Sequence, residues 1–126
     1  AGVPEIEVGT PAMGRHEIAA IRAIVDAALP VTPIAWCRMR IEDVDAALAA
    51  NVPMVNLSVP VSDVQIAAKL RGGREEAIAR IAKVVGYARD HGLDVAVGGE
   101  DSSRADLDFL VQVVHAAQAA GARRVR

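Results

Sequence analysis

Residues 93–106 have the sequence LDVAVGGEDSSRAD, and this stretch predicts a change from strand to helix. An apolar run containing Val95 and Val97 ends at two glycines and is followed by acidic residues, two serines and an apolar-periodic segment. That order predicts a strand, a tight polar turn at the glycines and the start of a helix. Ser103 and Asp106 have the spacing of a capping box, with the carboxylate at the positive end of the helix dipole.

Glu100 is the residue of this stretch that capping does not explain. It follows the predicted strand directly, where α/β proteins bind their ligands. The two glycines before it let a substrate or a backbone segment approach closely. Glu100 is therefore a candidate functional residue, whereas Asp101 and Asp106 have structural explanations.

The same strand-and-helix unit recurs along the 126-residue chain. Four segments share a helix end, a Gly or Asn, one or two residues and a strand: AGVPEIEV at 1–8, AANVPMVNL at 49–57, DHGLDVAV at 90–97 and AAGARRVR at 119–126. Strands are predicted at 5–8, 33–38, 54–59, 95–97 and 123–126. Amphipathic helices are predicted between them, the first over 16–29 and ended by Pro30. Such alternation predicts βα units on a parallel sheet with right-handed crossovers.

Two architectures fit this alternation, an open doubly wound sheet and part of a (βα)8 TIM barrel. A complete barrel needs about 250 residues, and this chain supplies about half of that number. Residues 1–126 are expected to form one domain, since a chain of this length can bury about two-thirds of its unfolded surface. The chain does not begin with Met, and we expect further sequence upstream of Ala1.

Composition excludes several classes of protein. Apolar residues make up 52% of the chain and the formal net charge is −2, with both signs interspersed, so we expect no nucleic-acid partner and no anionic membrane partner. No apolar run approaches the roughly 20 residues of a membrane span and no signal peptide is visible, so a soluble cytoplasmic protein is expected. Cys37 is alone, cannot form an internal disulfide, and is predicted to be a small buried hydrophobic residue.

The common phosphate and metal motifs are not found. GTPAMG at 9–14 lacks the Lys-Ser/Thr that contacts phosphate and Mg²⁺, and no GxGxxG occurs. The histidines, at positions 16, 91 and 115, have no spacing typical of a metal site. Asp43 and Asp45 are interpreted as solvated charges in the first turn of a helix. Lys69 to Arg71 are interpreted as a solvated loop, with contact to an anionic substrate as the alternative.

Polar residues lie where the predicted strands end. They are Glu7, Arg38, Ser58 and Glu100, with Asn56 inside its strand. Because the carboxyl ends of parallel strands meet at one rim of a sheet, these side chains are expected to converge there. The set contains no nucleophile–base pair, and therefore indicates a polar substrate oriented around another group, such as a metal supplied elsewhere.

The chain resembles homocitrate synthases of the nitrogen-fixation type. The resemblance is carried by EIEVGTPAMG at 5–14, IAWCRMR at 34–40, VNLSVPVSD at 55–63 with the later KL, and GGEDSSRADLDFLVQVVHAAQAAGARRVR at 98–126. These enzymes belong to the acyl-CoA-using Claisen condensation family, with isopropylmalate synthases, citramalate synthases and hydroxymethylglutaryl-CoA lyase. The resemblance covers essentially the whole chain.

The resemblance implies a (βα)8 barrel, of which this chain would be the second to fifth βα units and the start of the sixth strand. It implies an acyltransferase that condenses acetyl-CoA with a 2-oxo dicarboxylic acid, 2-oxoglutarate, and a homo-oligomer. It also implies a divalent metal, Mg, Mn or Zn, that polarises the keto oxygen while a base removes a proton from the thioester methyl group.

The resemblance also implies roles for individual residues. Glu100 is similar to the fifth-strand glutamate of the family's acid–base network, and is the predicted catalytic residue. Glu7 is similar to the second-strand glutamate that helps to hold the 2-oxo acid. Trp36 and Asn56 replace a His and an Asp of lysine-biosynthetic relatives, which carry an Arg and a Ser at the positions of Ala96 and Gly98. The predicted substrate-binding residues are Glu7, Trp36, Arg38, Asn56 and Ser58.

Asn56 leaves the choice of 2-oxo acid open, so isopropylmalate synthesis is an alternative. The first-strand motif with the family's metal Asp and the seventh-strand His-x-His are both missing, so no metal ligand is predicted in this chain.

By itself the chain is expected to be inactive and, with two unpaired sheet edges, to self-associate or be poorly stable. A non-catalytic α/β binding module is the alternative from another functional class.

Overall fold

The computed structural model describes residues 2–126, so Ala1, which opens the first repeated unit, lies outside the described residues. The strands are β1 (Glu5–Gly9), β2 (Thr32–Arg38), β3 (Met54–Pro60), β4 (Asp94–Glu100) and β5 (Arg124–Val125). The α-helices are α1 (Arg15–Asp26), α2 (Ile41–Ala49), α3 (Asp63–Lys69), α4 (Gly73–Asp90) and α5 (Leu107–Ala119). Two 3-10 helices follow strands, η1 (Pro11–Met13) after β1 and η2 (Ser102–Arg104) after β4.

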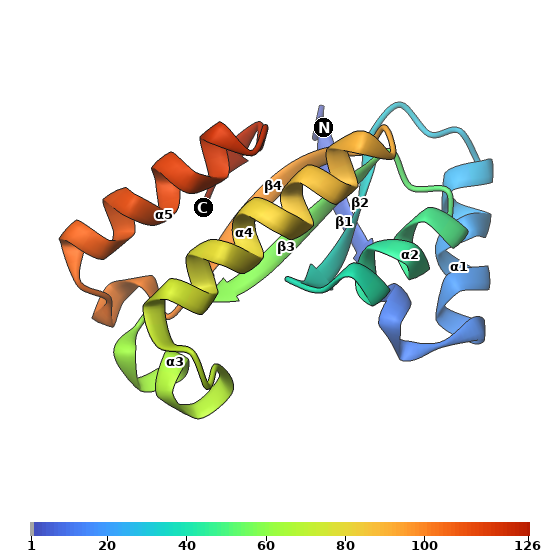
Figure 1. The fold of residues 1–126 in the computed structure, drawn as a ribbon. Coiled ribbons are helices and arrows are strands. Elements are labelled where there is room, and N and C mark those ends of the chain that lie inside the picture. Colours follow the sequence, from blue (N-terminus) through green and yellow to red (C-terminus); the bar gives the residue numbers. More distant parts are fainter. Residues whose placement is uncertain (1) are drawn as a thin grey trace.

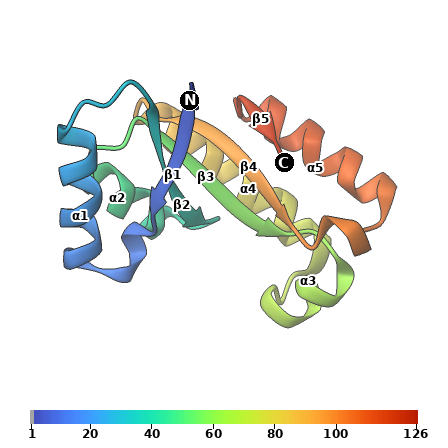
Figure 2. The same ribbon diagram turned by 180° about the vertical axis from the view of Figure 1, so that it is seen from behind.

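The strands form one parallel sheet in the order β1-β2-β3-β4-β5. A doubly wound sheet reverses its strand order at a switch point, whereas a barrel adds each strand beside the previous one. The sequential order therefore confirms the barrel alternative. Figures 1 and 2 show the helices on one side of the sheet, and its other face carries none of the described helices.

The face of the sheet that meets the helices is apolar. Its β-branched and leucine side chains form one cluster with the apolar stripes of the helices, including Val55, Leu57, Val95 and Val97 from strands and Val44, Ile81 and Phe109 from helices. β3 is the central strand of the sheet and is buried along its whole length. This cluster holds the strands in register and so fixes where each one ends.

The opposite face of the sheet is concave. β1 and β5 are separated by four strand spacings, about 19 Å in a flat sheet. Yet Glu5 Oε2 lies 2.5 Å from Arg124 Nη1, and Glu7 Oε2 lies 2.7 Å from Arg126 Nη2. These ion pairs require the edge strands to curve toward each other, as strands of a barrel do.

The repeated unit ends each helix with a residue that has a positive φ. Asn51, Gly92 and Gly121 have φ values of 60°, 84° and 99°. This left-handed conformation reverses the chain after the helix, and it is the one that Gly and Asn adopt most readily. The predicted exit of each helix is thereby confirmed at these three positions.

The end of α1 differs from its prediction. The helix ends at Asp26 rather than at Leu29, because Ala28 has a φ of 48° and turns the chain before Pro30. Leu29 lies beyond the helix and its side chain is largely exposed. The apolar spacing of Leu29 with the helix residues was therefore coincidental.

The turn after β4 also differs from its prediction. β4 continues through Gly98 and Gly99 to Glu100, which lies opposite Pro60 of β3, and the turn begins at Asp101. Because η2 intervenes, α5 starts later than predicted. Its N-cap is Asp106, whose Oδ1 accepts from the backbone N–H of Phe109 at 2.9 Å, so the capping box on Ser103 was wrong.

Candidate functional site

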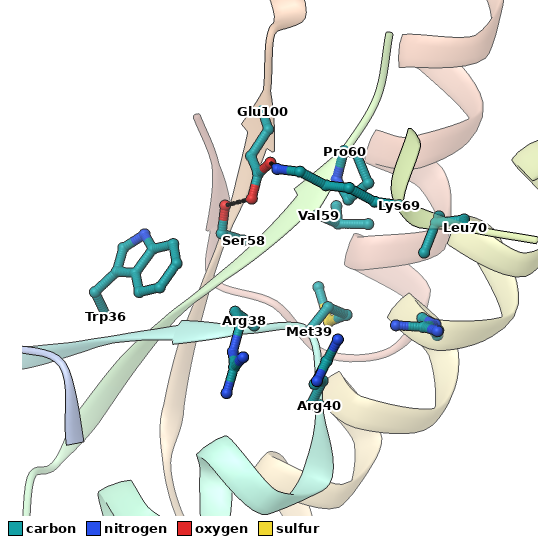
Figure 3. Close-up of a pocket in the computed structure, with 11 residues that line it drawn as sticks. Trp36, Arg38, Met39, Arg40, Ser58, Val59, Pro60, Lys69, Leu70 and Glu100 are labelled. Atoms are coloured by element: carbon teal, nitrogen blue, oxygen red, sulfur yellow. Dashed lines mark hydrogen bonds and ion pairs between the residues drawn. The ribbon is translucent and has the colours of Figure 1, made fainter. Parts of the chain in front are cut away.

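A cavity of about 350 Å³ opens at the carboxyl rim of the sheet, between the ends of β2, β3 and β4. Figure 3 shows the residues around it. They are Trp36, Arg38, Met39, Arg40, Ser58, Val59, Pro60, Lys69, Leu70, Arg80 and Glu100. The structure thus brings four predicted site residues together in one cavity: Trp36, Arg38, Ser58 and Glu100.

Glu100 lies between a hydroxyl and an ammonium group. The Ser58 hydroxyl donates to Glu100 Oε1 at 2.9 Å, and Lys69 Nζ forms an ion pair with Glu100 Oε2. Ser58 is buried within β3, whereas Glu100 is partly exposed at the end of β4. These two contacts fix the orientation of the Glu100 carboxylate. They also place two groups with exchangeable protons beside it, the Ser58 hydroxyl and the Lys69 ammonium group.

Arg38 is fixed by a carboxylate from the next helix. Asp43 accepts three hydrogen bonds from Arg38, from its backbone N–H, its Nε and its Nη2, each at 2.9 Å. Asp43 is 2% exposed, so its prediction as a solvated charge was wrong. The contact with Asp43 raises the pKa of the Arg38 guanidinium, first through the hydrogen bonds and then through its negative charge. The remaining N–H groups, on Nη1 and Nη2, are available for an anion.

Trp36 and Asn56 lie beside each other on the concave face, at paired positions of β2 and β3. Asn56 is buried but is outside the residues that line the cavity. Among the described residues, its Oδ1 has no hydrogen-bond partner. An added Cβ at Gly98 would lie 3.3 Å from this oxygen, so the small residue leaves Asn56 its space.

Glu7 lies apart from the cavity. Its carboxylate pairs with Arg126 across the concave face, and it is not among the residues that line the cavity. Of the polar residues expected to converge at the rim, Arg38, Ser58 and Glu100 line the cavity, whereas Asn56 and Glu7 lie on the same face but outside it. Trp36, which the resemblance added to the predicted site, lines the cavity as well.

The helix α3 carries Lys69 to the site and is tied to the end of β4 at both of its own ends. At its start, the Ser62 hydroxyl accepts from the backbone N–H of Gln65 at 3.2 Å and donates to Asp101 Oδ2 at 2.6 Å. At its end, Lys69 pairs with Glu100. Asp101 is held in turn by Arg104, and the hydrogen bonds from Arg104 and Ser62 lower the pKa of its carboxyl group.

Sequence reasoning missed the contributions of Arg40, Arg80 and Asp43. For Lys69 it preferred a solvated loop and kept contact with a substrate as the alternative, and the structure places Lys69 at the cavity, paired with Glu100. Arg80 lies in the middle of α4, 42 residues from Arg38 by number, and only the packing of α4 on the sheet brings it to the cavity. No local pattern could have identified it.

The described residues do not bring three His, Cys, Asp or Glu side chains together in a way that would hold a metal ion. The divalent metal implied by the resemblance therefore does not fit this set of residues by itself. Within residues 2–126, no helix combines the length and the apolar character needed to cross a membrane.

Comparison with known proteins agrees with the fold and places the chain in a family. The HMGL-like family matches residues 1–126. The chain is 48% identical to homocitrate synthase 1 of Nostoc sp. and 42% identical to the homocitrate synthase alpha subunit of Clostridium pasteurianum, in each case over 99% of its length. It spans 33% and 46% of these two proteins. Citramalate and isopropylmalate synthases are among its other relatives.

The structure matches the crystal structure of HMG-CoA lyase from Brucella melitensis with a TM-score of 0.73 at 18% identity, over 98% of this chain and 47% of that one. Sheet order, concave face and rim cavity together define about half of a (βα)8 barrel with a polar site at the carboxyl ends of its strands. The chain belongs to the HMGL-like family.

Proposed function

We propose that this chain forms the second to fifth βα units, and the start of the sixth strand, of the barrel of a homocitrate synthase. The complete protein would transfer the acetyl group of acetyl-CoA to 2-oxoglutarate. The identities to homocitrate synthases support the reaction class. The observation that carries the proposal is the arrangement of Glu100 between Ser58 and Lys69 at the carboxyl rim.

This arrangement suits proton transfer during condensation. Claisen condensation requires removal of a proton from the thioester methyl group and delivery of a proton to the oxygen that was the keto group. A carboxylate hydrogen-bonded to a hydroxyl and paired with an ammonium group can accept a proton or pass one on. We assign Glu100 to this proton-transfer network and Ser58 and Lys69 to holding it in place.

The charges around the cavity favour a dicarboxylic 2-oxo acid. Four cationic side chains line it, those of Arg38, Arg40, Lys69 and Arg80, and Glu100 is its one acidic side chain among the described residues. A second substrate carboxylate would gain charge-assisted hydrogen bonds there, whereas the branched apolar end of 2-oxoisovalerate would gain none. The cavity therefore supports homocitrate synthesis over isopropylmalate synthesis.

The divalent metal would take its ligands from segments outside this chain, where the family's first-strand and seventh-strand motifs lie. When bound, it would supply Lewis-acid polarisation of the keto oxygen. The residues of this chain would bind and orient the 2-oxo acid and move the proton. Residues 1–126 alone are accordingly expected to be inactive.

The test is made on the complete protein, by following the thiol of released CoA with each of three 2-oxo acids: 2-oxoglutarate, 2-oxoisovalerate and pyruvate. We expect 2-oxoglutarate to have the highest kcat/KM. We expect Glu100→Gln to lower kcat by about 10² or more, the usual contribution of a positioned acid or base. The control is Glu75→Gln, an exposed residue of α4 outside the cavity.

Three results would contradict the proposal. A preference for 2-oxoisovalerate would make the protein an isopropylmalate synthase and leave the role of Glu100 intact. A fully active Glu100→Gln variant would remove Glu100 from the proton-transfer network. Absence of CoA release with every 2-oxo acid would favour a non-catalytic binding module.

A further inference from the structure

Arg126 adds a cation to the concave face from a strand that does not line the cavity. Its backbone N–H donates to the carbonyl oxygen of Val97 at 2.9 Å, and its own carbonyl oxygen accepts from the N–H of Gly99 at 2.8 Å. In a parallel pair of strands these two hydrogen bonds place Arg126 opposite Gly98. Its ion pair with Glu7 shows that the side chain lies on the concave face.

This position completes a row of four residues across four strands. Arg38 of β2 lies opposite Ser58 of β3, which lies opposite Gly98 of β4, and Arg126 is the fourth. The row has an arginine at each end. Between them lie the hydroxyl that holds Glu100 and a glycine without a side chain. Ser58 and Arg126 are two strand spacings apart, about 10 Å between their backbones in a flat sheet.

The Arg126 guanidinium has donors that no described residue uses. Its Nη2 donates to Glu7 Oε2 at 2.7 Å, and the side chain makes no other hydrogen bond or ion pair with residues 2–126. A guanidinium carries five N–H groups, and half of this side chain is exposed. Glu7 therefore orients Arg126 on the concave face and leaves N–H groups free for an anion.

β4 leaves space for a ligand beside Arg126. The residues of β4 that face this side below Glu100 are Ala96 and Gly98, and a Cβ at Gly98 would lie 3.3 Å from Asn56 Oδ1. This oxygen is buried and has no hydrogen-bond partner among the described residues. Buried polar atoms without partners are rare in folded proteins, so a further donor is expected here. A guanidinium opposite Gly98 can supply such a donor and still bind a carboxylate.

The charge of the cavity favours a diacid without assigning its two carboxylates to residues. The keto group has to lie beside Glu100 for proton transfer, so the carboxylate bonded to the keto carbon lies near Lys69 and Arg38. The other carboxylate extends away from these groups. We propose that Arg126 binds this far carboxylate and so selects a dicarboxylic over a monocarboxylic 2-oxo acid. The inference rests on the proposed function, because that function supplies the 2-oxo acid.

The test uses the complete protein with Arg126→Gln and Arg126→Lys. It compares 2-oxoglutarate with 2-oxopentanoate, which has the same five carbons and no second carboxylate. We expect Arg126→Gln to lower kcat/KM for 2-oxoglutarate about tenfold or more, through loss of charge-assisted hydrogen bonds, and to leave kcat/KM for 2-oxopentanoate within about twofold. Arg126→Lys keeps the charge but not the planar fork, so its loss should be intermediate.

Arg124→Gln is the matched control. Arg124 lies two residues earlier on the same strand and pairs with Glu5 across the concave face, as Arg126 does with Glu7. A loss that comes only from breaking such a pair should affect both acids equally, so Arg124→Gln should not change the ratio of their kcat/KM values. Calorimetric titration of each variant with the two acids, without acetyl-CoA, measures binding independently of turnover.

Each outcome has one interpretation. A selective loss for 2-oxoglutarate in Arg126→Gln, absent from Arg124→Gln, supports the assignment. Equal losses for the two acids, or no loss, overturn it and leave the condensing activity in place. If the wild type condenses neither acid, the proposed function fails, and the titrations still decide whether Arg126 recognises the second carboxylate. If Arg126→Gln does not fold, Arg126→Lys, which can still pair with Glu7, provides the same comparison.

Discussion

Asp43 is the one charged side chain in the core of the described residues. All three of its hydrogen-bond donors belong to Arg38, so the carboxylate and the guanidinium hold each other. A buried carboxylate is tolerated only when it is paired and hydrogen-bonded. The pair therefore couples the start of α2 to the end of β2, and it sets the direction in which Arg38 offers its remaining donors.

Removing this carboxylate should both weaken the fold and loosen the site. We expect Asp43→Ala to lower the free energy of unfolding by about 2 kcal/mol, because the Arg38 backbone N–H loses its acceptor and the half-exposed guanidinium loses its partner. Urea unfolding measures the loss. Asp45→Ala, which removes an exposed acid of the same helix and its one hydrogen bond from Tyr87, should cost less than about 1 kcal/mol because that contact is solvent-exposed. Equal losses of unfolding free energy in the two variants would show that the contact with Arg38 does not stabilise the fold.

Cys37 should be inert at ordinary pH. Burial, and secondly the negative charge of Asp43, raises the pKa of its thiol from 9.0 to about 12. Because the folded state holds this proton more tightly than the unfolded state does, its contribution to stability is complete below pH 9.0 and is lost as pH rises toward 12. At pH 8.5, iodoacetamide should modify the urea-unfolded chain and leave the folded chain unmodified. Rapid modification of the folded chain would contradict this burial.

At the scale of elements, α3 is the segment whose position depends most on specific polar contacts. It is only seven residues long and buries one side chain, that of Ile66. Its attachment to β4 through Ser62 and Lys69 therefore decides whether Lys69 reaches Glu100. A short helix with little buried apolar surface gains most of its stability from such contacts.

Loss of the first attachment should release the helix. We expect Ser62→Ala to cost about 1 kcal/mol, the usual loss for an N-cap, and to speed hydrogen exchange in α3 more than in α4. If Lys69 positions Glu100, kcat should fall in the same variant. Ser103→Ala, which removes an exposed hydroxyl from η2, should change neither exchange nor kcat. Unchanged exchange in α3 after Ser62→Ala would contradict the attachment.

The elements themselves were largely predictable because their signals are local. Apolar periodicity and the repeated unit identified the strands and most of the α-helices, and Asn51, Gly92 and Gly121 marked three helix exits, whereas η1 and η2 were not predicted. The errors at the end of α1 and at the start of α5 are local, whereas those in the site arose where a tertiary contact decides the outcome. No spacing rule indicates that Arg38, five residues earlier, will pair with Asp43, and nothing near Lys69 indicates Glu100, 31 residues away. Strand ends predicted a site at the rim, but not which helices would complete it.

For the whole molecule, the open edges of the sheet are the main physical constraint. β1 and β5 each pair on one side only, so the outer backbone groups of both strands are exposed to solvent. Apolar side chains lie near both edges: Val3, Ile6 and Leu29 on the side of β1, and Leu107, Val111 and Val114 on α5. In a complete barrel, neighbouring βα units would cover such edges.

Residues 1–126 expressed alone should therefore self-associate. We expect sedimentation velocity at micromolar concentrations to give species larger than the 13.2 kDa monomer. Ile6→Lys on β1, or Val111→Lys on α5, should reduce association, because a charge at an edge opposes pairing with another chain. The control Ala82→Lys adds the same charge on the exposed face of α4, away from both edges.

Whether the isolated chain self-associates or stays monomeric distinguishes the two proposed functions, a segment of a catalytic barrel and a non-catalytic binding module. Association that the edge lysines relieve and Ala82→Lys does not would indicate that the edges normally meet other βα units, as a segment of a catalytic barrel requires. A monomer that unfolds in one cooperative transition would mean that the ion pairs from Glu5 and Glu7 across the concave face suffice to close the molecule. In that case the concave face is complete without further strands, and the binding module becomes the better account of the chain.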